Sequence, residues 1–217
     1  MGKEKLSIGE VVAWYKNTTK LSFQKFADSL TENFNKDLSR QAVNYWFHDV
    51  TEPETDFMLQ IWITYQDWRQ YFAWDVLNTK LPEAFNSDDT FFRKFFLLDR
   101  KNKNTMEVKD QVTQYQEWSG LTLRGFVATL TESVKMDDLS HVALQYWKDG
   151  KTVPETDFLI QCLIAYDDWR AMFAYDMLRA KLPEVFIDGN LERKRKEFGE
   201  AGYGKVVLGN VAGPDGE

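Results

Sequence analysis

The chain carries one segment twice, and this internal repeat constrains its fold more than any other feature. When the sequence is compared with itself at a shift of 101, residues 38–85 align with 139–186 without a gap. Of the 48 aligned pairs, 26 are identical, and PETDF, DWR and KLPE recur intact. A tandem duplication of this length indicates two homologous units that share one fold.

The repeat continues upstream at a shift of 100, where SFQKFADSLTE at 22–32 aligns with TLRGFVATLTE at 122–132. The difference of one residue falls in the polar stretch that follows each Thr-Glu pair, where a loop absorbs it. This organisation predicts a first unit at 1–86, a linker at 87–110, a second unit at 111–187, and a charged stretch with a Gly-rich tail at 188–217.

Apolar residues recur at helical spacing in each unit, so the sequence predicts an all-α fold. Ile8, Val11, Val12 and Tyr15 share one face of a first helix, and Ser39 is a favourable N-cap for a later short helix. The phenylalanine-rich first half of the linker predicts a connecting helix with its phenylalanines inward. The Gly-rich tail is expected to be flexible.

A longer helix is predicted in the last part of each unit, where Pro53 fits the first turn and Pro82 ends the helix. Its apolar positions, three or four residues apart, are Phe57, Ile61, Tyr65, Trp68 and Phe72. Within this helix we interpret Asp67 and Arg69 as solvated charges beside a buried tryptophan. An exposed ion pair of this kind contributes little to stability.

One nonamer of the repeat carries the strongest functional signal, reading LSRQAVNYW at 38–46 and LSHVALQYW at 139–147. In each copy a short helix precedes a Ser-capped helix with apolar residues at its fourth and seventh positions, and a loop and a proline follow. This pattern resembles the helix-turn-helix of the Cro and lambda-repressor class, with its S-x-x-x-V-x-x-W recognition helix. The preceding turn, TENFNKDLS or TESVKMDDLS, is longer than the tight turn of that class.

The resemblance implies two tandem helix-turn-helix bundles that bind double-stranded DNA sequence-specifically, as in a transcriptional regulator of bacterial or phage type. Outward side chains of each second helix would read base edges, where Arg suits guanine and Asn or Gln suits adenine. Val142 and Asp149 offer poorer chemistry to bases, so the second unit is expected to bind more weakly. The DNA-contacting residues implied in this way are Ser39, Arg40, Gln41, Asn44, His48, Ser140, His141, Gln145, Lys148 and Lys151.

A second function stays open, namely a protein-interaction or structural module, such as a phage virion or transcription-complex component, that kept the fold without DNA binding. The formal net charge of −7 favours this alternative, because proteins that bind nucleic acid over their whole surface are usually basic. The aromatic helices also favour it, because Trp62, Trp68, Trp74 and Trp169 exceed what a small helical unit needs; most such aromatics are expected in the core, and some are available for an interface with a partner. The tail offers KVVLGNV, a β-prone run that can add to the edge of a partner's sheet.

No catalytic or metal-binding pattern accompanies these motifs. His48 and His141 have no ligand partners at a recognised spacing, and the single Cys162 closes neither a zinc site nor an internal disulfide. We therefore expect no enzymatic activity, no metal and no cofactor. The N-terminal residues show no secretory signal and no apolar run spans a bilayer, so we expect no membrane partner and a bacterial cytoplasmic location or a virion.

Overall fold

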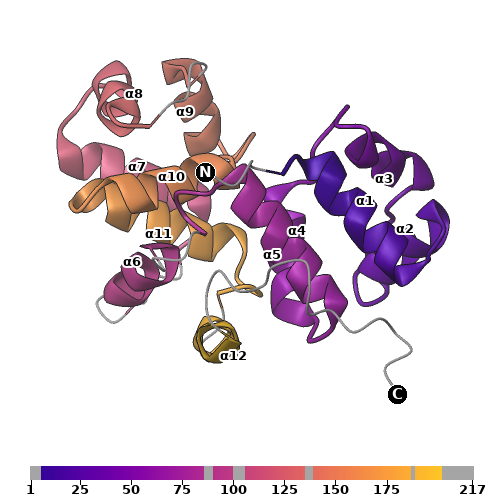
Figure 1. The fold of residues 1–217 in the computed structure, drawn as a ribbon. Coiled ribbons are helices and arrows are strands. Elements are labelled where there is room, and N and C mark those ends of the chain that lie inside the picture. Colours follow the sequence, from indigo (N-terminus) through magenta and orange to yellow (C-terminus); the bar gives the residue numbers. More distant parts are fainter. Residues whose placement is uncertain (1–5, 86–89, 100–105, 135–138, 187–188, 202–217) are drawn as a thin grey trace. The chain divides into compact units, whose positions relative to one another are not determined.

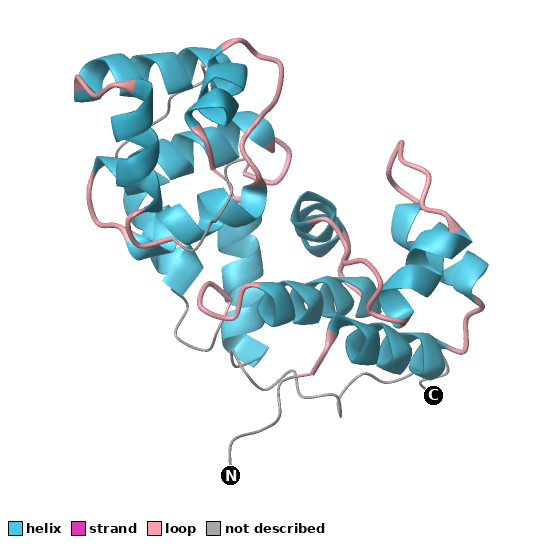
Figure 2. Cartoon of the chain, turned by 90° about the horizontal axis from the view of Figure 1, so that it is seen from above, coloured by secondary structure: helices cyan, strands magenta, loops and turns pink. Residues whose placement is uncertain are grey.

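The computed structural model describes residues 6–85, 90–99, 106–134, 139–186 and 189–201. Every regular element in these ranges is an α-helix, which confirms the all-α prediction (Figures 1 and 2). Contacts divide the chain into two compact units, one that includes residues 1–87 and one that includes 88–195. None of the described helices combines the length and the apolar character needed to cross a membrane. The tail at 202–217, with its KVVLGNV run, lies outside the described residues.

Residues 6–85, the described part of the first repeat, form α1 (Ile8–Thr19), α2 (Phe23–Thr31), α3 (Arg40–Phe47), α4 (Thr55–Thr64) and α5 (Trp68–Lys80). α3 packs against α1 and α2, α5 packs against α4, and α1 packs against α5. Each helix therefore buries one apolar face in a shared core. The core side chains include Val11, Tyr15, Phe26, Leu30, Val43, Trp46, Phe57, Ile61 and Phe72.

The second unit repeats this helix order with α7 (Val108–Ser119), α8 (Leu123–Thr131), α9 (His141–Lys148), α10 (Thr156–Ala165) and α11 (Trp169–Lys181). Each helix begins and ends 100 or 101 residues after its counterpart, which are the two shifts that align the sequences. Trp46 and Trp147 are equivalent and buried, with 5% and 4% of their surface exposed. The duplicated sequence has therefore produced duplicated helices.

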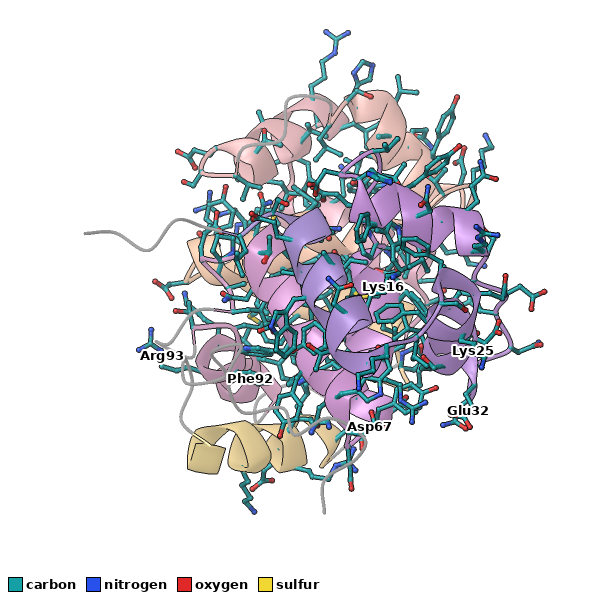
Figure 3. The ribbon with its side chains drawn as sticks, turned by 45° about the vertical axis from the view of Figure 1, so that its right-hand side comes forward. Lys16, Lys25, Glu32, Asp67, Phe92 and Arg93 are labelled. Carbon is teal, nitrogen blue, oxygen red and sulfur yellow. The ribbon has the colours of Figure 1, made fainter. Side chains whose placement is uncertain are left out.

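α6 (Thr90–Asp99) lies within the expected linker and packs against α10 and α11 of the second unit. Phe92 on this helix is buried and Arg93 is exposed (Figure 3). Phe95 stacks on Phe186 with 4.8 Å between ring centroids. The expected helix with inward phenylalanines is present, and it completes the second core. A last helix, α12 (Asn190–Ala201), follows the second unit in the sequence.

The prediction of one long helix after Pro53 is wrong, because the chain forms two helices separated at Tyr65–Asp67. Tyr65 is extended, with φ −94° and ψ 156°, and Asp67 caps α5 by accepting the N–H of Arg69 at 2.9 Å. Pro53 precedes the N-cap instead of lying in the first turn. The break allows α4 and α5 to pack on each other, and both bury apolar residues, so the apolar spacing alone did not reveal it.

The interpretation of Arg69 as a solvated charge is also wrong, whereas Asp67 is exposed as expected. The Arg69 side chain is only 14% exposed and forms ion pairs with Asp67 at 2.6 Å and Glu32 at 2.7 Å. Burial alone would raise the pKa of Asp67, but hydrogen bonds from Arg69 hold it below its ordinary value. Glu32 lies 37 residues away in the sequence, so no local pattern indicated this contact. The tryptophan between them, Trp68, is half-buried.

Candidate nucleic-acid interface

The first candidate surface is the solvent side of α3, whose orientation is fixed by its buried side. Ser39 caps the helix by accepting the N–H of Ala42 at 3.1 Å, as the sequence indicated. Val43 is fully buried, and Trp46 lies in the same core beneath α1 and α2. These contacts determine which side chains of α3 can meet a partner.

The outward side chains of α3 are the ones expected from the sequence. Arg40, Gln41 and His48 are exposed, and Asn44 is half-buried. Gln41 donates a hydrogen bond to the hydroxyl of Tyr45. Within the part of the chain that the structure describes, the Arg40 and Asn44 side chains make no hydrogen bond or ion pair. A guanidinium and an amide therefore face solvent, and these groups suit guanine and adenine edges.

The equivalent polar side chains of the second unit are engaged within the chain. Gln145 donates to Asp149 at 2.7 Å, and Lys151 donates to the same carboxylate at 2.9 Å. These two hydrogen bonds hold the pKa of Asp149 below its ordinary value. Lys148 donates to the amide oxygen of Gln116 on α7 at 2.7 Å. A base or phosphate would have to displace these contacts.

The remaining surface of α9 is more apolar than that of α3. Ser140 caps the helix by accepting the N–H of Ala143 at 3.2 Å, and His141 is exposed beside it. Val142 and Tyr146, one helical turn apart, are 44% and 43% exposed. The expected site residues therefore lie on equivalent faces of the two units, but those faces differ in chemistry.

Asp49 is a structural residue that the sequence analysis missed at the end of α3. Its carboxylate accepts the N–H of Gly9 at 2.6 Å and the hydroxyl of Ser7 at 2.8 Å, which joins α3 to the start of α1. The backbone of Asp49 is in the left-handed region, with φ 53°, and Gly150 at the equivalent position of the second unit has φ 68°. The alignment of Asp49 with Gly150 could have indicated a left-handed turn at this position, because aspartate and glycine both adopt positive φ more readily than most residues.

Positive charge around α3 is sparse. Lys36 precedes the helix, but it pairs with Glu54 at 2.7 Å and lies over the ring of Phe57 at 4.8 Å. Lys25 on α2 is exposed, and Glu32 near the end of the same helix is exposed as well (Figure 3). Only a few phosphates can therefore be neutralised by this surface.

A second candidate surface is an apolar groove in the second unit between α7 and α11. The groove has a volume of about 320 Å³ and is lined by Gln114, Tyr115, Trp118, Trp169 and Met172. Trp118 is 69% exposed, which is unusual for so large an apolar side chain.

Comparisons of the chain with family models, with curated proteins and with solved structures give no match.

Proposed function

We propose that the chain binds duplex DNA sequence-specifically and that α3 of the first unit is the recognition helix. The observation that supports this proposal is that Arg40 is exposed and Asn44 half-buried on a helix whose Val43 and Trp46 are held in the core. In a helix-turn-helix protein, a helix held in this way enters the major groove and contacts bases with its outward side chains. Arg40 would bind guanine through its planar fork, and Asn44 would bind adenine.

Contacts to phosphates would fix the position of α3 on the duplex. The N-terminus of α2, capped by Ser22, presents backbone N–H groups of the kind that bind phosphate, and Lys25 lies in its first turn. The Ser39 hydroxyl accepts one hydrogen bond at the cap and keeps its own proton to donate. Since few cationic side chains are exposed here, we expect binding to depend less steeply on salt than in strongly basic proteins.

The second unit would contribute less to base recognition, because Gln145 and Lys148 are already engaged within the chain. Its attachment to the first unit nevertheless raises the local concentration of one DNA-binding unit once the other is bound. We propose that the protein acts in this way as a transcriptional regulator of bacterial or phage type, in the cytoplasm of the host cell.

The test is a binding selection against random duplexes at two salt concentrations, followed by affinity measurements on the selected site. Arg40→Ala should weaken binding to that site by about 1–3 kcal/mol and relax the preference at one base pair. The matched change in the second unit, His141→Ala, should have a smaller effect. If the wild-type chain enriches no sequence and binds no duplex, the DNA-binding proposal is wrong.

A protein-interaction function is the second candidate, and the exposed Trp118 beside the apolar groove favours it. Here the second unit would bind apolar side chains of another protein, as a component of a virion or a transcription complex. A peptide selection against the wild-type chain should then enrich apolar peptides whose binding Trp118→Gln removes. The same variant should keep its DNA affinity. A selection that enriches no peptide dependent on Trp118 would contradict this function.

A further inference from the structure

The last turn of α2 ends in carbonyl groups that its own helix cannot satisfy, and side chains from the α4–α5 junction bind them. Arg69 Nη1 donates to the carbonyl of Ser29 at 2.9 Å. The Tyr65 hydroxyl donates to the carbonyl of Leu30 at 3.5 Å and accepts the N–H of Asn33 at 3.2 Å. The end of α2 is therefore capped by residues that lie more than 30 positions later in the chain.

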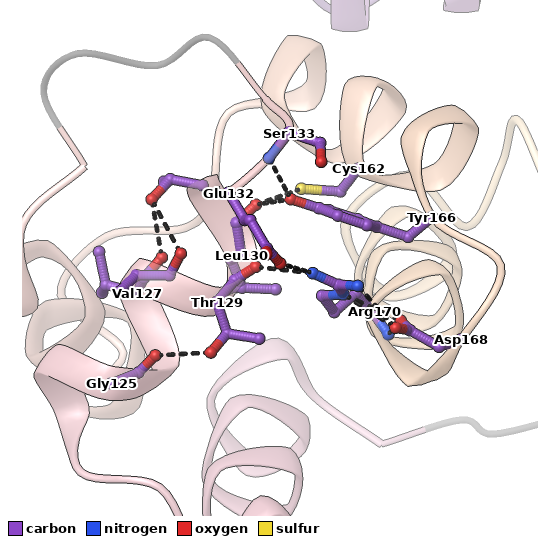
Figure 4. Close-up of polar contacts among 12 residues, drawn as sticks. Gly125, Val127, Thr129, Leu130, Glu132, Ser133, Cys162, Tyr166, Asp168 and Arg170 are labelled. Carbon is purple, nitrogen blue, oxygen red and sulfur yellow. Dashed lines mark hydrogen bonds and ion pairs between the residues drawn. The ribbon is translucent and has the colours of Figure 1, made fainter.

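The second unit repeats this arrangement (Figure 4). Arg170 Nη1 donates to the carbonyl of Thr129 at 3.1 Å, and the Tyr166 hydroxyl donates to the carbonyl of Leu130 at 2.9 Å. The same hydroxyl accepts the N–H of Ser133 at 2.9 Å. Each unit thus directs two side chains at the end of its second helix: a tyrosine that ends α4 or α10, and an arginine in the first turn of α5 or α11.

We call each arginine–tyrosine pair, Arg69 with Tyr65 and Arg170 with Tyr166, a clamp. The arginine of the first clamp is held from several sides. The guanidinium of Arg69 lies 3.5 Å from the ring centroid of Tyr65, and Nε and Nη2 bond to both carboxylate oxygens of Asp67. Its Nη1 also donates to Glu32 at 2.7 Å. Because a bidentate, stacked guanidinium has little freedom left, its remaining N–H bonds point in fixed directions.

We propose that Arg69 and Arg170 are positioning residues: Arg69 sets the path of the chain from α2 to α3, and Arg170 sets the direction in which the chain leaves α8 at residues 132–134. In the Cro-like class a tight turn fixes the second helix relative to the first. Here the connection, residues 32–39, is longer. The orientation of α3 relative to α2 is therefore set by the arginine and tyrosine that bind the end of α2. The inference rests on the proposed function only where it predicts a change in DNA affinity. The change in the α2–α3 connection can be measured without DNA.

A role limited to general stability would make a different prediction from a positioning role. If the clamp only adds stability, its loss lowers protection from hydrogen exchange across the whole unit. If the clamp positions the connection, its loss opens residues 32–39 while the amides inside α4 and α5 keep their protection. Hydrogen exchange measured residue by residue by NMR on the full chain separates the two cases.

The mildest variant is Tyr65→Phe, which keeps the ring beneath the guanidinium and removes only the hydroxyl. We expect the Asn33 amide to exchange about tenfold faster in this variant, and the Ser133 amide to be unchanged. Tyr166→Phe should produce the opposite pattern, so each unit serves as the control for the other. The proposal would be overturned if the Asn33 amide exchanged equally fast in Tyr65→Phe and the wild type, or if the Ser133 amide did so in Tyr166→Phe.

Arg69→Lys tests the guanidinium, since lysine keeps the charge but loses the planar fork. We expect faster exchange across residues 32–39, unchanged exchange inside α5, and about tenfold weaker binding to the selected duplex. A uniform loss of protection in the first unit would show a merely structural role and overturn the proposal. If the wild-type chain binds no DNA, the proposed function fails, and the exchange pattern still decides whether Arg69 positions the connection.

Discussion

A hydrogen-bonded pair between α1 and α5, in which Tyr15 is buried and Asp75 half-buried, predicts an unusual dependence of stability on pH. Tyr15 donates a hydrogen bond to Asp75 at 2.7 Å. Burial raises the pKa of Asp75 from 3.8 to about 6, although the hydrogen bond from Tyr15 opposes that rise. The folded state therefore binds this proton more tightly than the unfolded state does. The resulting contribution to stability is fully present below about pH 4 and is lost as the pH rises through about 6.

The expected magnitude follows from the size of the pKa change. A rise from 3.8 to about 6 corresponds to about 3 kcal/mol, at 1.36 kcal/mol for each pKa unit. Asp75→Asn removes the charge and keeps an oxygen that accepts the Tyr15 hydroxyl. Relative to the wild type, this variant should therefore gain up to about 3 kcal/mol of unfolding free energy between about pH 4 and pH 7.5.

Two measurements check this reasoning. Urea unfolding of the wild type and Asp75→Asn at both pH values gives the difference in free energy, and carbon NMR of the Asp75 carboxyl gives its pKa directly. Tyr15→Phe is the control, because loss of a hydrogen bond that lowers the pKa should raise it further. An Asp75 pKa at or below about 4 in the folded protein would refute the argument.

Three further predictions concern packing. A Cβ at Gly9 would lie 2.7 Å from the Phe47 carbonyl oxygen, so Gly9→Ala should cost about 1–3 kcal/mol in urea unfolding, whereas Lys109→Ala at the matched position should cost little. Burial raises the pKa of the Cys162 thiol to about 12, so iodoacetamide should label it only as fast as the second unit opens; rapid labelling of the native chain would contradict this burial. Trp46→Ala and Trp147→Ala should each cost about 3–5 kcal/mol in unfolding free energy, and a loss below about 1 kcal/mol would show that the ring is not part of the core.

The sequence predicted what local chemistry and repetition determine. Ser39 and Ser140 cap their helices as expected, because a hydroxyl before an apolar-periodic run satisfies free backbone N–H groups wherever the helix is placed. The break at Tyr65–Asp67 was missed because α4 and α5 both bury apolar residues at helical spacing. The clamp of Arg69 on Ser29 was missed because the two residues meet only in the folded unit, 40 positions apart. Long-range contacts of this kind leave no periodic signal.

The positions of the nonamer fall into two groups in the structure: those that cap the helix or fill the core, and those that face outward. Ser39 and Trp46 recur as Ser140 and Trp147, because these residues cap the helix and fill the core in both units. The outward positions occupied by Arg40 and Gln41 carry different residues in the second unit.

Tyr45 and Tyr146 depart from this division, because they are identical in the two copies yet 39% and 43% exposed. A core requirement cannot explain an exposed tyrosine, and each ring borders the face proposed to meet DNA or a protein. Tyr45 accepts a hydrogen bond from Gln41, whereas Lys151 lies over the ring of Tyr146 at 5.3 Å. Both units therefore expose an aromatic ring at the same position, beside polar neighbours that make the two faces different.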